Sequence, residues 1–222
     1  GIHKKNPIFD LKKKKVDILV NLSASPYTFK KLELRSKVSS FAAKYLQVPL
    51  IYVNQIGAND NLIFDGNSFI LDKNGSKIKQ LKSFSEDLSS WHIEQTIPEK
   101  KEFEQSEISS IFDALVLGVR DYAQKCGFKT ALIGLSGGID SALVSAIATA
   151  ALGSNNIYCV SMPSKWSSSH SKSDAKDLAR RLKINFNSIP IENLMNSFEE
   201  SFIKTISFEM AEITNQNIQS RI

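Results

Sequence analysis

The sequence predicts an α/β protein made of two parts. Short apolar segments typical of buried strands alternate with segments of helical periodicity, both before residue 95 and after residue 106. Residues 96–106 are charged, contain Pro98 and lack apolar periodicity, which indicates a linker between domains at 1–95 and 107–222. The length of 222 residues agrees with this division, because it corresponds to about one and a half domains at roughly 150 residues each.

Composition narrows the class of protein. With 42% hydrophobic and 23% charged residues, the chain is typical of globular proteins rather than of collagen-like or disordered ones. No apolar run approaches the roughly 20 residues of a membrane span, and no signal-peptide pattern begins the chain. The two cysteines, Cys126 and Cys159, are too few for a disulfide framework. We therefore expect a reduced, cytoplasmic protein with no membrane partner.

The net charge of +5 is concentrated near the N-terminus, where residues 1–37 hold ten Lys or Arg against three acidic residues. Aromatic residues do not interleave with the run Lys12–Lys15, and no zinc-finger spacing or RNA-binding aromatic motif is present. A charge run alone is more often a solvated helix face than a nucleic-acid site. We expect no nucleic-acid partner.

Residues 1–95 predict a strand, a helix, a second strand and then a hairpin. The apolar run Val16–Leu22 leads into Ser23-Ala24-Ser25-Pro26, as expected for a buried strand that enters a loop. Residues 32–46 have the apolar spacing of a helix, at Leu34, Val38, Phe41, Ala42, Tyr45 and Leu46. The later strand-like segments are Pro49–Asn54, Leu62–Phe64 and Ser68–Leu71, with turns at Asp65–Asn67 and Lys73–Gly75.

Residues 107–222 predict a helix followed by alternating strands and helices. Ser106 is a candidate cap for the first helix and Gly127 a candidate end. Its apolar stripe consists of Ile108, Ile111, Phe112, Leu115, Val116 and Val119. The strand-like segments that follow are Lys129–Leu135, Ile157–Met162 and Phe186–Ile191, and the helical ones are Ala142–Leu152 and Ser173–Leu182. This alternation predicts a parallel sheet with right-handed crossovers.

The most informative residues are Ser136-Gly137-Gly138-Ile139-Asp140-Ser141, between a predicted strand and a predicted helix. Consecutive glycines let the backbone approach an anion, and the amides and dipole at a helix start favour phosphate. The hydroxyls of Ser136 and Ser141 can donate to phosphate oxygens. Asp140 would repel phosphate, so its sensible role is to bind Mg²⁺. The alternative is an ordinary strand-to-helix turn in which Ser and Asp act as caps.

This loop, Ser-Gly-Gly-x-Asp-Ser after an apolar strand, resembles the pyrophosphate loop of N-type ATP pyrophosphatases. Two further segments, Ile111–Tyr122 and Met162–Ala175, resemble the opening helix and the second-strand loop of the NAD synthetase ligase domain, which implies that Met162 lies at the ATP site. The segment Thr214–Arg221 resembles Thr-Glu-Glu-Asn-Ile-Gln-Ala-Arg of the same family, which implies deamido-NAD contacts at Asn217 and Arg221. Trp166, Asn215 and Gln216 depart from the residues usual in the family. A solvated helix-end cation remains the alternative for Arg221.

The first region resembles the later part of a nitrilase-type amidase domain, most closely the glutaminase domain fused to bacterial NAD synthetases. Three segments carry this resemblance, namely Asn21–Pro26, Tyr52–Gly57 and Phe64–Phe69. The resemblance implies that Ser25 and Lys31 hold the glutamine carboxylate. A surface lysine at a helix start is the alternative for Lys31. Lys30 stands where the family usually has glycine.

The resemblance implies a fold in two pieces. These are the C-terminal part of a nitrilase-like α-β-β-α sandwich and the first part of a parallel-sheet, adenine nucleotide α-hydrolase-like (Rossmann-like) domain. The family's nucleophilic Cys, with its Glu and Lys, would lie upstream of residue 1, and further ligands downstream of residue 222. We therefore expect an internal piece of a glutamine-dependent NAD synthetase that contains no catalytic residue of the glutaminase.

The resemblance implies that the parent enzyme uses Mg-ATP to amidate deamido-NAD with ammonia from glutamine, and that it is a homo-oligomer. Two alternatives remain open: a non-catalytic ATP-binding remnant, and an N-type pyrophosphatase that acts on another acceptor. The three histidines lie far apart in the sequence, so no zinc site is predicted.

Overall fold

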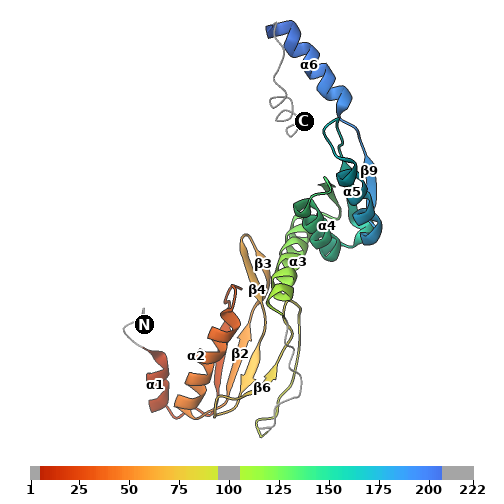
Figure 1. Cartoon of the computed structure of the whole chain (residues 1–222). Coiled ribbons are helices and arrows are strands. Elements are labelled where there is room, and N and C mark those ends of the chain that lie inside the picture. Colours follow the sequence, from red (N-terminus) through yellow and green to blue (C-terminus); the bar gives the residue numbers. More distant parts are fainter. Residues whose placement is uncertain (1–5, 95–105, 207–222) are drawn as a thin grey trace. The chain divides into compact units, whose positions relative to one another are not determined.

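The computed structural model describes residues 6–94 and 106–206, and the chain divides into two compact units, 1–122 and 123–222 (Figure 1). Asn217 and Arg221 lie outside the described residues. Each unit has its own sheet and core. The α/β class predicted from the sequence is confirmed.

The first unit is built on a four-stranded sheet of order β1-β2-β5-β6. Its strands are β1 (Leu19–Ser23), β2 (Leu50–Asn54), β5 (Phe69–Leu71) and β6 (Lys77–Gln80). β1 and β2 are parallel, and the other two pairs are antiparallel. Helix α2 (Lys31–Leu46) covers one face of this sheet, and the short helix α1 (Pro7–Lys13) packs beside α2 (Figure 1). The core between helix and sheet contains Ala42, Ala43, Leu50, Tyr52, Phe69 and Leu71.

Helix α2 has the predicted extent but buries a different side from its most apolar one. Its buried residues are Arg35, Ser39, Ala42, Ala43 and Leu46. Leu34 and Val38 of the predicted apolar stripe are 59% and 61% exposed. Small residues face the sheet because they allow the helix to approach it closely, and this places the long Arg35 side chain inside the unit.

A separate two-stranded sheet pairs β3 (Ile56–Asn59) with β4 (Leu62–Asp65). The turn at 65–67 therefore leads from one sheet to the other, since β5 pairs with β2 and β6 rather than with β4. β3 and β4 form one hairpin, and β5 and β6 form a second, where the amide of Gly75 donates to the carbonyl of Asp72. Gly75 has a φ of +74° in this turn.

Helix α3 (Glu107–Cys126) begins and ends as the sequence predicts. The Ser106 hydroxyl accepts a hydrogen bond from the amide of Ser109 at 3.1 Å, and Gly127 follows the helix with a φ of +75°. Ala114 and Leu117 are buried with Phe84, against Tyr27, Ile56 and Ile63. Most of this helix lies in the first unit, which extends to Tyr122.

The second unit is a parallel sheet of order β7-β8-β9, as predicted. Its strands are β7 (Ala131–Gly134), β8 (Ile157–Ser161) and β9 (Asn185–Ser188). The helices are α4 (Ile139–Leu152), α5 (Ser169–Leu182) and α6 (Glu192–Ile206), with a 3-10 turn η1 (Ser154–Asn156) before β8. The core consists of Leu135, Ala148, Ile157, Cys159, Ala175, Ala179 and Ile184.

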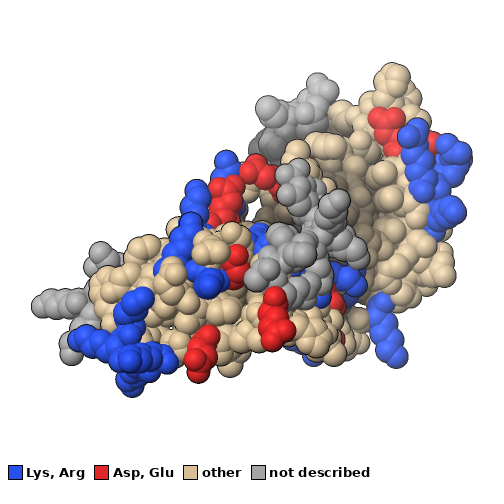
Figure 2. All heavy atoms as spheres, turned by 90° about the horizontal axis from the view of Figure 1, so that it is seen from below, with Lys and Arg blue, Asp and Glu red and all other residues tan. Residues whose placement is uncertain are grey.

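Within the described residues, no helix is long and apolar enough to cross a membrane. On the face drawn in Figure 2, Lys and Arg side chains lie in several separate groups with other residues between them. The basic residues therefore do not merge into one continuous surface on that face.

Candidate functional site

The glycine-rich loop lies at the carboxyl end of β7, directly before helix α4. The hydroxyls of Ser136 and Ser141 are 3.1 Å apart, and Ser141 Oγ donates to the carbonyl of Gly138 at 3.0 Å. The amide of Gly138 donates to Ser136 Oγ at 3.2 Å. These bonds bring the two predicted serines together at the start of α4, with both side chains in contact with solvent.

Gly137 and Gly138 differ in conformation, and glycine suits the two positions for different reasons. Gly137 has a φ of +87°, and a Cβ there would collide with the backbone of Ser171 in α5. Gly138 precedes α4 with extended backbone, and no side chain caps this helix. The first amides of α4 are therefore open to an anion, which the helix dipole also favours.

Asp140 lies in the exposed first turn of α4. The described residues contain no group of three or more His, Cys, Asp or Glu side chains placed to hold a metal by themselves. A single carboxylate still fits Mg²⁺, because this ion commonly binds one or two carboxylates together with substrate phosphates and water. The donor set suits a metal that arrives with a polyphosphate.

The loop after β8 lies at the same edge of the parallel sheet as the glycine-rich loop. Met162 is 48% exposed, and its Cε lies 3.5 Å from the Cβ position of Gly134 at the end of β7. Ser164 is buried, and its hydroxyl accepts from the amide of Trp166 at 3.2 Å. Ser168 caps α5 by accepting from the amide of Ser171 at 3.0 Å. The predicted site residues 136–141 and 162 therefore line one edge of one sheet.

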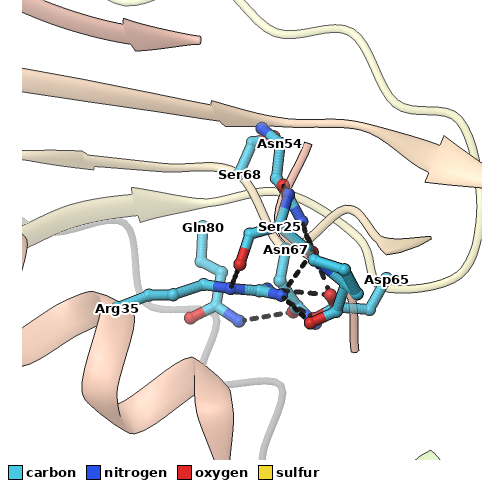
Figure 3. Close-up of polar contacts among 8 residues, drawn as sticks. Ser25, Arg35, Asn54, Asp65, Asn67, Ser68 and Gln80 are labelled. Atoms are coloured by element: carbon cyan, nitrogen blue, oxygen red, sulfur yellow. Dashed lines mark hydrogen bonds and ion pairs between the residues drawn. The ribbon is translucent and has the colours of Figure 1, made fainter. Parts of the chain in front are cut away.

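A second cluster lies in the first unit, around Ser25 (Figure 3). Arg35 donates from Nε to Ser25 Oγ at 3.1 Å and from Nη2 to the Ser25 carbonyl at 2.7 Å. The amide of Ser25 donates to Asn54 Oδ1 at 2.9 Å. The loop after β1 is thus fixed to α2 and to the end of β2.

Asp65 closes this cluster at the end of β4. Arg35 Nη1 donates to both carboxylate oxygens, at 2.8 and 3.0 Å, and Asn67 Nδ2 donates to Oδ2 at 2.8 Å. Arg35 and Asp65 are 6% and 1% exposed, so the pair is buried. No buried side-chain nitrogen or oxygen in the described part of the chain lacks a hydrogen-bond partner, which a buried ion pair requires in order to be tolerated.

Lys31, the other predicted glutamine ligand, begins α2 one turn before Arg35. The structure shows no hydrogen bond or ion pair of its ammonium group with another described residue and does not connect it directly to Ser25. Lys30, before it, has a φ of +59°. This left-handed conformation favours glycine, which is the residue expected at this position from the sequence resemblance.

Arg35 and Asp65 were missed from the sequence. Arg35 occurs within a helical segment whose apolar residues Leu34 and Val38 predict a different buried face, and the sequence around Asp65 predicts only a turn. The signal in the sequence for a buried ion pair is an acidic residue, Asp65, directly after an apolar strand. Its partner is far away in the chain, so the sequence does not identify it.

Two protein families match this chain. The carbon–nitrogen hydrolase family matches residues 2–101, and the NAD synthase family matches residues 111–222, half of the chain. The chain belongs to the NAD synthase family. Together with the hydrolase part, it is similar to glutamine-dependent NAD synthetases, which are carbon–nitrogen ligases. The enzyme of this name from Synechocystis sp. is 44% identical over 98% of the chain, and that from Rhodobacter capsulatus is 37% identical over 93%.

Solved structures agree with the family assignment. A glutamine-dependent NAD⁺ synthetase from Acinetobacter baumannii, in complex with ADP, matches 96% of the chain with a TM-score of 0.84 and 35% identity. One from Cytophaga hutchinsonii matches 95% with a TM-score of 0.82 and, at 19% identity, supports the fold alone. The chain spans about two fifths of the length of these relatives: 40% of the Synechocystis protein and 41% of the Acinetobacter chain.

Proposed function

We propose that this chain contributes the ATP site and part of the glutamine site to an ATP-dependent amidation of deamido-NAD. In this reaction the nicotinate carboxylate oxygen attacks the α-phosphorus of ATP, and pyrophosphate leaves. Ammonia from glutamine then attacks the acyl carbon, and AMP leaves. Adenylation helps because AMP is a better leaving group than oxide.

The observation that carries the proposal is the Ser136–Ser141 loop at the open start of α4. The amides of Gly137 and Gly138 and the hydroxyls of Ser136 and Ser141 would donate to phosphate oxygens. For this, the Gly138 amide and the Ser141 hydroxyl would exchange their present bonds to Ser136 Oγ and to the Gly138 carbonyl for bonds to phosphate. Met162 would contribute apolar surface toward the nucleotide. The relative from Acinetobacter baumannii was solved in complex with ADP, which supports the use of an adenine nucleotide. Asn217 and Arg221 are proposed for deamido-NAD from the sequence resemblance alone.

Asp140 would hold Mg²⁺ beside the phosphates. The ion supplies charge compensation for the departing pyrophosphate. This chain would contribute one exposed carboxylate, that of Asp140, next to the donors for phosphate.

Ser25 and Lys31 are proposed to bind the α-carboxylate of glutamine through a hydroxyl and an ammonium group. The chain alone is expected to release no ammonia from glutamine. Cys159 is fully buried in β8, and Cys126 is exposed at the end of α3. Both are about 100 or more residues from Ser25 in the sequence. A cytoplasmic location and a homo-oligomeric parent stay predictions from the sequence.

The test is exchange of labelled pyrophosphate into ATP by the 222-residue chain, with Mg²⁺ and deamido-NAD. We expect exchange that requires deamido-NAD and is strongly reduced in Ser136→Ala. Ser201→Ala in α6, whose hydroxyl bonds only its own helix at Ser197, is the matched control. ATP binding without exchange would favour a non-catalytic remnant, and exchange with a different acceptor would favour another pyrophosphatase. Ammonia released from glutamine by the pure chain would contradict the expected absence of glutaminase activity.

A further inference from the structure

Every nitrogen of the Arg35 guanidinium donates to an oxygen of the protein. Nε donates to Ser25 Oγ, and Nη1 donates to both oxygens of Asp65. Nη2 donates to the carbonyls of Ser25 at 2.7 Å and Pro26 at 3.2 Å. Each nitrogen of Arg35 is therefore engaged by the protein, although Arg35 is a buried cation next to a proposed carboxylate site.

The bond from Arg35 orients the Ser25 hydroxyl. Since its oxygen accepts from a charged N–H, its own proton is directed to another acceptor, and the charge makes the hydroxyl a stronger donor. The Ser25 backbone is held as well, because its amide donates to Asn54 and its carbonyl accepts from Arg35. The hydroxyl is thus fixed in place as a donor.

We propose that Arg35 is a positioning residue for the amino-acid α-carboxylate, acting through the Ser25 hydroxyl and held in plane by Asp65. Lys31 lies four residues before Arg35, hence on the same side of α2, and supplies the cation that meets the carboxylate. This role rests on the proposed glutamine site at Ser25 and Lys31.

Asp65 makes the geometry specific to arginine. Its two oxygens both accept from Nη1, and Asn67 and Asn54 donate to the carboxylate from other directions, at 2.8 and 3.5 Å. A lysine at position 35 would bring a charge without the rigid fork, so it could not serve Asp65 and Ser25 together.

The test is calorimetric titration of the 222-residue chain with L-glutamine and with glutamine α-amide, whose carboxylate is replaced by a neutral amide. Ser25→Ala is expected to weaken the binding of L-glutamine about tenfold and to change the binding of the α-amide little. Arg35→Met combined with Asp65→Asn removes both buried charges together, so neither is left unpaired. This double variant is expected to lose as much affinity for L-glutamine as Ser25→Ala does. The triple variant, which combines all three substitutions, is expected to bind L-glutamine no more weakly than either. Lys37→Met, on the exposed side of α2, is the control expected to bind normally.

The outcomes separate this role from the proposed function. Additive losses in the triple variant, or equal losses for the two ligands, would assign Arg35 a structural role only and overturn the proposal. Normal binding by Arg35→Met/Asp65→Asn beside weak binding by Ser25→Ala would overturn the role of Arg35 and leave the glutamine site standing. No saturable binding by the unaltered chain would contradict the glutamine site and this role together. The thermal unfolding curve of each variant shows whether it is folded.

Discussion

The backbone of Ser171 fills the space beside the α-carbon of Gly137. A Cβ on Gly137 would lie 2.8 Å from the Ser171 carbonyl carbon and 2.9 Å from its Cα, both closer than a real Cβ tolerates. The glycine-rich loop after β7 is therefore shaped by the first turn of α5, a different segment of the chain. Any side chain at position 137 must displace either the glycine-rich loop or the first turn of α5.

Gly137→Ala is expected to disrupt the loop and abolish measurable ATP binding. The left-handed backbone alone costs alanine about 1–2 kcal/mol, and the contact with Ser171 adds to this. Gly127→Ala is the matched control, because Gly127 also has a positive φ but has nothing within 4 Å of its Cβ position. Urea unfolding and ATP titration of both variants measure the effect. Equal losses of stability and ATP affinity in the two would show that the Ser171 contact is unimportant.

Asp140→Asn is expected to weaken ATP binding only when Mg²⁺ is present. With Mg²⁺, the variant loses a carboxylate ligand, and ATP binds about tenfold more weakly. Without the ion, removal of a negative charge beside phosphate leaves ATP affinity equal or higher. Asp140 is exposed in the first turn of α4, so the stability cost is at most about 1 kcal/mol from the helix dipole. Weaker binding under both conditions would contradict a role as metal ligand.

The glycine-rich loop could be predicted from the sequence because its donors are contiguous. Six neighbouring residues between an apolar strand and a helix predict a phosphate site without knowledge of any distant contact. The parallel sheet followed from the alternation of segments for the same reason. Only the contact of Gly137 with Ser171 required the structure.

The cluster at Ser25 could not be predicted in the same way. It joins the loop after β1, the middle of α2 and the end of β4, so Arg35 and Asp65 are 30 residues apart in the chain. The apolar pattern of α2 also pointed to Leu34 and Val38, whereas the sheet packs on the small residues of the helix. Strand β6 was missed because Ile78 is its only apolar residue, and β3 because it is short and contains Gly57.

Asp121→Ala is expected to lower the free energy of unfolding of the first unit by about 2 kcal/mol. Asp121 Oδ2 accepts from the amide of Ala58 at 2.7 Å and thereby ties α3 to strand β3. Glu107→Gln is the control on the same helix, since its ion pair with Lys30 is exposed and 3.7 Å long. Such pairs contribute at most about 1 kcal/mol. Chemical denaturation followed by circular dichroism measures both, and an effect of Asp121→Ala no larger than that of the control would contradict the prediction.

Tyr27 is expected to make the stability of the first unit decrease at high pH. Burial, the Asp65 carboxylate and the Glu107 carboxylate, in that order, raise the pKa of Tyr27 above its usual value of 10.0. Because the folded chain holds the phenol proton more tightly, this contribution is complete below pH 10 and is lost as the pH rises through the folded-state pKa. The free energy of unfolding, measured from pH 8 to 11, should therefore fall more steeply for the unaltered chain than for Tyr27→Phe. Glu107→Gln should keep most of the difference, since burial is the main cause. Parallel pH profiles of the unaltered chain and Tyr27→Phe would show that Tyr27 ionises equally in both states.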